Sequence, residues 1–131
     1  MPRRTAIYLP GFGHANPIPV ASRIGPHLVS GALTGRDPST RELPPSLEEQ
    51  CANVFAHVRA LMEAAGGTPD DIIKMTVWLA DPGDRQALNR EWVAMFPDVD
   101  SRPARHVIPQ VGGGALIQVD LTAVLAEPAS G

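Results

Sequence analysis

The apolar positions of the chain change their period along its length, which predicts where it is helical. Between residues 47 and 65 they recur at helical spacing on one face. That face consists of Leu47, Cys51, Val54, Phe55, Val58, Leu61, Met62 and Ala65. Residues 46–49 form a capping box at its start, in which Ser46 accepts from a backbone N–H and Glu49 reaches back. Gly66 and Gly67 end this predicted helix.

A second, shorter apolar stripe predicts a helix that begins at residues 82–84 and ends at Pro97. The stripe is formed by Leu88, Trp92, Met95 and Phe96. Between the two helices, residues 72–79 alternate as a strand does. Ile73, Met75, Val77 and Leu79 would share one face, and Lys74, Thr76 and Trp78 the other.

Short apolar runs near the start predict further strands. Residues 6–9 form one short run, which is followed by a loop rich in glycine and proline. Residues 20–24 and 27–30 flank Gly25 and Pro26, which predicts a hairpin.

Residues 101–124 contain two apolar runs on either side of three glycines, which predicts a second hairpin. Arg105 opens the first run and Asp120 lies in the second. If Val107 lies opposite Asp120, Arg105 becomes a diagonal neighbour of Asp120 on the polar face. A register shift of one residue would put the two on opposite faces. The alternation favours the shared face, because it keeps Arg105 away from the apolar side.

The order of these elements predicts an α+β domain over residues 1–131, with both helices on one face of the sheet. Residues 1–15 would form an N-terminal strand and loop extension. The opposite face is half apolar, since it carries Trp78 and Leu116 beside Thr76 and Asp120. No helix remains to cover it, so we expect a second copy of the chain to do so.

Composition narrows the class of protein further. The formal net charge of -3 argues against nucleic acid as a partner. A single cysteine excludes an internal disulfide and suits a reducing compartment, and no run approaches the roughly 20 apolar residues of a membrane span. The start has too short an apolar run for a signal peptide. These features predict a cytoplasmic protein without a membrane partner.

Several polar residues are candidates for chemistry. Arg105 could hold a carboxylate in two parallel hydrogen bonds, although spacing alone favours a salt bridge with Asp120 or a solvated strand end. Asp120 could act as a general base. Ser30 lies in no nucleophile motif and would be a hydrogen-bonding wall. The four histidines, His14, His27, His57 and His106, have no metal-ligand spacing, so we predict no metal and no cofactor.

Several motifs, in order and at near-family spacing, resemble the RidA/YjgF family of imine deaminases over residues 16–125. They are Asn16-Pro17-Ile18-Pro19, Val29-Ser30-Gly31, Asp37-Pro38, Glu48-Glu49-Gln50, Ala64-Ala65-Gly66, Asp71 to Val77, Asn89 and Arg102-Pro103-Ala104-Arg105. The last motif, followed fifteen residues later by an acid, is specific. The resemblance implies a chorismate-mutase-like fold, a homotrimer, and sites between subunits.

The implied reaction is cofactor-free hydrolysis of 2-imino or 2-enamino acids to 2-keto acids and ammonia. By the same resemblance, Arg105 would bind the substrate carboxylate and Asp120 would place the water. Ser30 and Gly31 would form the wall of the site, with Asn89 near the cleft. Ile18 and Val107 would occupy two further substrate-contacting positions.

Three positions depart from the family pattern and keep alternatives open. Ile18 stands where tyrosine is common, Val107 where cysteine is frequent, and Asp120 where glutamate is usual. Tyr8, Phe12 and His14 would reshape the pocket for a bulkier substrate. The chain could therefore serve a dedicated catabolic or biosynthetic pathway, with an aminomuconate-like or other enamine as substrate. It could also be a non-catalytic binding or chaperone-like trimer. RNA cleavage is the least favoured reading.

Overall fold

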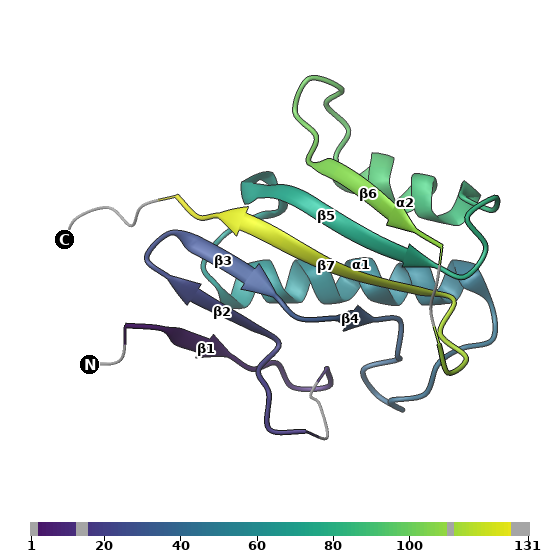
Figure 1. Cartoon of the computed structure of the whole chain (residues 1–131), viewed down its shortest axis with the longest axis horizontal. Helices are drawn as coiled ribbons and strands as arrows, with labels where there is room; N and C mark the ends of the chain where they lie inside the picture. The colour runs from purple at the N-terminus through teal and green to yellow at the C-terminus, as the bar shows by residue number, and fades with distance from the viewer. Residues whose placement is uncertain (1–2, 13–15, 110–111, 127–131) are drawn as a thin grey trace.

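The computed structural model describes residues 3–12, 16–109 and 112–126, and these form one mixed seven-stranded sheet (Figure 1). The order across it is β1-β2-β3-β7-β5-β6, and β4 pairs with β7 beyond the end of β3. The strands are β1 (Thr5–Ile7), β2 (Ala21–Ile24), β3 (His27–Ser30), β4 (Leu33–Thr34), β5 (Ile72–Leu79), β6 (Ala104–Ile108) and β7 (Ile117–Val124). The hairpin predicted around Gly25 is confirmed as β2 and β3.

Two helices, α1 (Leu47–Ala64) and α2 (Gln86–Met95), lie on the same side of the sheet, as predicted (Figure 1). Ser46 Oγ accepts from the Glu49 N–H at 3.1 Å, which supplies the serine half of the capping box. The predicted start of the second helix at residues 82–84 is wrong. There the N–H of Asp84 donates to the Asp81 carbonyl in a turn, and the helix begins only at Gln86.

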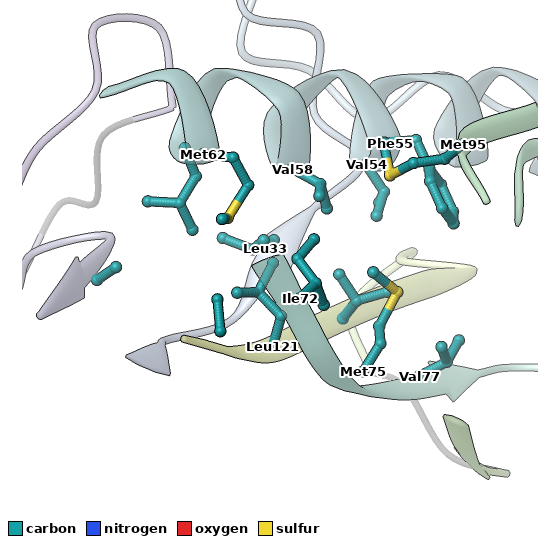
Figure 2. Close-up of a cluster of buried hydrophobic side chains, with 14 of the residues drawn as sticks. Leu33, Val54, Phe55, Val58, Met62, Ile72, Met75, Val77, Met95 and Leu121 are labelled. Atoms are coloured by element: carbon teal, nitrogen blue, oxygen red, sulfur yellow. The ribbon is translucent and has the colours of Figure 1, made fainter. Parts of the chain in front are cut away.

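The hydrophobic core lies between α1 and the sheet. Figure 2 shows Val54, Phe55, Val58 and Met62 of α1 directed toward Leu33, Ile72, Met75, Val77 and Leu121 of the strands. The apolar stripe of α1 is buried apart from Leu47, which is half-buried. No helix in the described part of the chain is long and apolar enough to cross a bilayer.

A β-bulge corrects one predicted face of β5. The register with β7 shifts between Ile72 and Lys74, which inserts an extra residue into β5. Ile72 is buried as a result, and Ile73, predicted to face the core, is 54% exposed. From Lys74 onward the alternation follows the prediction, with Met75 and Val77 buried.

The hairpin predicted from residues 101–124 is wrong, because β6 and β7 are not neighbours. β5 lies between them, parallel to β6 and antiparallel to β7. The pattern of two apolar runs around glycines describes local turn formation, and it carries no information about a distant strand that inserts between the runs. The long, apolar β5 bonds to both of them and takes the central place.

Gln50 of α1 is a buried polar residue that ties the helix to two loops. Its Nε2 donates to the carbonyls of Pro44 at 2.8 Å and Gly114 at 3.4 Å. Its Oε1 accepts from the N–H of Leu116 at 2.8 Å, directly before β7. Gly35 packs so closely that an added Cβ would lie 2.8 Å from the Gln50 Cβ. The start of β7 is thus fixed to α1 by side-chain hydrogen bonds.

Candidate active site

Arg105 lies on the helix-facing side of β6 and is held there by α2. In the strand register it pairs with Met75, which is fully buried under the helices. The Arg105 Cζ lies 5.0 Å from the centroid of the Trp92 ring. Its Nη1 donates to Asn89 Oδ1 at 2.9 Å. Trp92 and Asn89 are three residues apart on one face of α2, so a single helix face positions the guanidinium.

The surroundings of Arg105 are electropositive. Desolvation by burial lowers the pKa of Arg105, and the nearby charge of Arg85 lowers it further. Among the described residues, Arg105 has no carboxylate at ion-pair distance. One edge of the guanidinium bonds to Asn89 and one face lies on Trp92. The remaining N–H donors are therefore suited to an external anion.

Asp120 lies on the opposite face of the sheet, the one without helices. It pairs with Thr76, which in turn pairs with His106 on the far side of β5. His106, Thr76 and Asp120 thus form a row across three strands. Desolvation by burial raises the pKa of Asp120, while a hydrogen bond from the Thr76 side chain and the charge of Lys74 partly oppose that rise.

The expectation that Arg105 and Asp120 share one face is therefore wrong for a single chain. Arg105 and Leu121 both pair with Met75, whereas Asp120 pairs with the next residue of β5, Thr76. Because side chains alternate along a strand, this one-residue offset directs Arg105 and Asp120 to opposite sides. The salt bridge between them, which spacing alone favoured, does not form.

Ser30 occupies the place where β3 leaves β7 and β4 takes over the pairing. Its Oγ accepts from the N–H of Leu121 at 2.9 Å and donates to the Gly31 carbonyl at 2.8 Å. The N–H of Gly31 donates to the Val20 carbonyl at 2.8 Å. Ser30 is buried and its hydroxyl replaces a missing ladder bond beside Asp120, so within one chain its role is structural.

The other predicted site residues fall into two places. Val107 pairs with Val77 and packs against the core on the same side as Arg105. Asn89 is exposed on α2 and binds Arg105 directly. Ile18 lies in the loop before β2, 49% exposed. The structure therefore brings Arg105, Asn89 and Val107 together, and it bonds Ser30 to the backbone of Leu121, the residue after Asp120.

Sequence reasoning missed Arg85 and Trp92 as neighbours of Arg105. The signal was present in the helix period, because Arg85, Asn89 and Trp92 follow one another at intervals of four and three residues. The apolar stripe predicts only a packing role for Trp92, which does contact Phe96 edge-on with ring centroids 4.8 Å apart. Its contact with the Arg105 guanidinium depends on β6 lying beside α2, and no local sequence pattern predicts that arrangement.

The N-terminal residues expected to reshape the pocket lie in different places. Phe12 stacks on His57 of α1 with ring centroids 3.9 Å apart, and Tyr8 is 66% exposed. His14 lies outside the described residues. Desolvation by burial lowers the pKa of His57 to about 4; the Thr34 backbone partly offsets this, although neither ring nitrogen reaches hydrogen-bonding geometry.

Two further candidates have no catalytic surroundings. Cys51 is fully buried, and desolvation raises the pKa of its thiol to about 12, so it is a core thiol as predicted. Within the described ranges, no group of three or more His, Cys, Asp or Glu side chains is placed to hold a metal ion.

The sequence matches a family model described as "Endoribonuclease L-PSP" over residues 21–125, which is most of the chain. The chain belongs to the RidA/YjgF family. A relative from Aquifex aeolicus, named a RutC family protein, is 30% identical over 98 residues, covering 73% of this chain and 78% of the relative. A second relative, from Escherichia coli K12, is named 2-iminobutanoate/2-iminopropanoate deaminase. It is 29% identical over 86 residues, which cover 65% of this chain and 67% of the relative.

Solved structures confirm the fold of this RidA-family chain. RidA from the Antarctic bacterium Psychrobacter sp. PAMC 21119 superposes with a TM-score of 0.82 at 26% identity, covering 92% of this chain and 99% of that one. The YjgF protein of E. coli gives a TM-score of 0.81 at 24% identity, with coverage of 92% and 98%. The expected α+β, YjgF-type sheet with two helices is thereby confirmed.

Proposed function

We propose that this protein hydrolyses 2-imino or 2-enamino acids to 2-oxo acids and ammonia. The observation that carries the proposal is the Arg105 guanidinium, which is backed by Trp92, bonded to Asn89 and free of a carboxylate partner among the described residues. A relative named as a deaminase of two such imines supports the same substrate class.

Arg105 would bind the substrate carboxylate in a bidentate manner, since carboxylate and guanidinium are planar and complementary. Binding at this one end fixes the position of the imine carbon. An imine carbon is already electrophilic, so correct orientation and one placed water supply much of the needed rate enhancement. Val107, on the same side as Arg105, and Ile18 would then contact the substrate side chain.

Asp120 would act as the general base. Its raised pKa improves it as a proton acceptor, and Thr76 lies opposite it in the strand register. The water oxygen bonds to the imine carbon while Asp120 takes one water proton, the C=N π electron pair moves to nitrogen, and Asp120 passes that proton to the nitrogen. Asp120 then takes the hydroxyl proton of the carbinolamine and gives it to the nitrogen, so that the C=O bond forms, the C–N bond breaks, ammonia leaves with the bonding electron pair and the carboxylate is regenerated. No cofactor enters the balance.

Because Arg105 and Asp120 face opposite sides of one sheet, the proposed site needs a second copy of the chain. We propose a homotrimer in which Arg105 of one copy meets Asp120 of the next, with Ser30 and Gly31 beside it. The helix-free face supports such an assembly. It exposes the apolar side chains of Ile24, Val29 and Val124 and has a hollow of about 200 Å³ beside them.

The test is an assay in which an amino-acid oxidase generates the imine and semicarbazide competes for it. Wild type should suppress semicarbazone formation and speed the appearance of 2-oxo acid, whereas Arg105→Ala should not. Arg90→Ala, which removes an exposed arginine of the same helix as Asn89, is the matched control and should behave as wild type. Equal rates for wild type and Arg105→Ala would disprove the proposal.

A ligand-binding trimer without turnover is a second candidate. The separation of Arg105 from Asp120 favours it, because Arg105 and its helix neighbours make an anion site without help from the base. It predicts Arg105-dependent binding of 2-oxobutanoate and no effect of the protein on imine hydrolysis. RNA cleavage, which the family description implies, gains no support from a net charge of -3.

A further inference from the structure

One turn before Asn89, at the N-cap of α2, the face that holds Arg105 begins with a second arginine, Arg85. Arg85, Asn89 and Trp92 follow at helical spacing, and the N–H of Asn89 donates to the Arg85 carbonyl at 2.8 Å. Side chains four residues apart lie about 5–6 Å from each other on a helix surface. Arg85 is therefore the neighbour of the residue that binds Arg105.

The positive charges of Arg85 and Arg105 are not neutralised by a nearby carboxylate of the described chain. Arg85 is exposed, and its Nε donates to the Pro82 carbonyl at 2.7 Å, while its two terminal nitrogens have no hydrogen-bond partner among the described residues. Within the described chain, neither Arg85 nor Arg105 has a carboxylate at ion-pair distance. The charge of Arg85 acts unfavourably on that of Arg105, and an anion with two negative groups relieves this repulsion better than an anion with one.

We propose that Arg85 binds a second anionic group of the substrate, so that the preferred substrates are imines of amino dicarboxylic acids. This rests on the proposed function, because it takes Arg105 as the site of the first carboxylate. The carboxylate next to the imine carbon lies on Arg105, and the side-chain carboxylate reaches one helical turn along α2 to Arg85. A substrate with an uncharged side chain would use Arg105 alone.

The geometry also explains why Asn89 binds Arg105 through a side-chain oxygen. Asn89 lies between the two arginines and accepts a hydrogen bond from Arg105 without adding negative charge. An aspartate there would neutralise Arg105 and compete with the substrate. An amide keeps both cations available, which suits a receptor for a dianion.

The experiment compares two imines on wild type and three variants. L-glutamate oxidase generates the dicarboxylate imine and an L-amino-acid oxidase acting on 2-aminobutanoate generates the monocarboxylate one, with wild type, Arg85→Gln and the control Arg90→Gln. Wild type should favour the dicarboxylate imine. Arg85→Gln should lower kcat/KM for it roughly 10- to 100-fold, mainly through KM, and change the monocarboxylate imine less than about twofold. Arg85→Lys should recover part of the loss.

Binding of the product-like acids gives a readout independent of turnover. By calorimetry, 2-oxoglutarate should bind wild type more tightly than 2-oxobutanoate, and Arg85→Gln should abolish that difference. Equal binding of the two acids by wild type, or an equal loss of both in Arg85→Gln, would overturn the inference about Arg85. If Arg105→Ala bound both acids as wild type does, the proposed function itself would fail instead, so the two failures are distinguishable.

Discussion

The surroundings of Arg105 and those of Asp120 differ in almost every physical respect. Arg105 lies between β6 and α2, backed by an aromatic ring and next to a second cation. Asp120 lies on the helix-free face, with a hydroxyl and a lysine as its neighbours. The surroundings of Arg105 are suited to binding an anion. Those of Asp120 raise the proton affinity of its carboxyl group.

Under the proposed function, each region supplies half of a site. An anion receptor without a base can bind but cannot hydrolyse, and a base without a receptor has no substrate to act on. Since β5 separates the two within a chain, only contact between copies can join them. The predictions below test whether the halves belong together and how strongly each depends on its neighbours.

The largest effect should come from mixing two inactive variants. Arg105→Ala and Asp120→Asn should each lower kcat/KM about 100-fold or more, because each removes a charged partner of the substrate or water. Co-refolding the two proteins should restore activity, since some interfaces then contain an intact Arg105 from one copy and an intact Asp120 from another. The deaminase assay above measures this.

The control for that experiment mixes Arg105→Ala with the double variant that carries both changes. No interface then contains an intact Arg105, so activity should stay low. Failure of the Arg105→Ala and Asp120→Asn mixture to exceed this control would mean that the halves do not combine across copies.

A second prediction concerns the buried His57 of α1 and the loss of folding stability in acid. His57 has its pKa lowered to about 4 in the folded chain, so the unfolded chain binds more protons below the usual value near 6.5. The contribution of neutral His57 to the free energy of unfolding should therefore be fully present above pH 6.5. It should fall by about 3 kcal/mol as the pH drops to 4. Urea unfolding of wild type and His57→Phe at pH 7 and 4.5 measures it. An equal loss in both proteins would contradict this assignment.

A third prediction compares the two tryptophans, one in each region. Trp92→Phe should weaken binding of 2-oxobutanoate about two- to fivefold, because indole attracts a cation more strongly than phenyl does. Trp78→Phe changes the half-buried tryptophan on the helix-free face and should leave binding as in wild type. Calorimetry on both variants decides it. A larger effect from Trp78→Phe would reverse the roles given to the two faces.

The smallest effect concerns Asp120 and stability. Its pKa is raised in the folded chain, so the folded chain binds protons more tightly than the unfolded chain does. Ionisation then destabilises the fold above the raised pKa, and this penalty vanishes below the ordinary value of 3.8. Asp120→Asn should give a small rise in Tm at pH 7 and no difference at pH 3. A lower Tm at pH 7 would mean that Lys74 and Thr76 outweigh burial.

The sequence predicts the elements well, because each follows from a local period. The stripe of α1 and the alternation of β7 are observed as expected. The prediction is wrong for Ile73, because a bulge changes the face of a strand without changing its composition. It is also wrong for the pairing of residues 101–124, because the partner of a strand is decided by distant segments that compete for its edges.

The candidate site was therefore predicted residue by residue and not as a geometry. Arg105 and Asn89 were named from their motifs, and the structure joins them at 2.9 Å. The sequence predicts Arg105 and Asp120 equally well as site residues, but the structure directs them to opposite faces of the sheet. A motif specifies the chemical groups, whereas the side of the sheet on which each lies depends on a register that shifts with a single residue.

The side-chain amide of Gln50 has a consequence for how this chain can vary. By binding the backbone of Gly114 and Leu116, directly before β7, it anchors the start of that strand independently of the connection from β6. Insertions or deletions between residues 109 and 113 should then leave Asp120 where it is. The length of that loop is therefore free to change while the Asp120 carboxylate stays in register with Thr76.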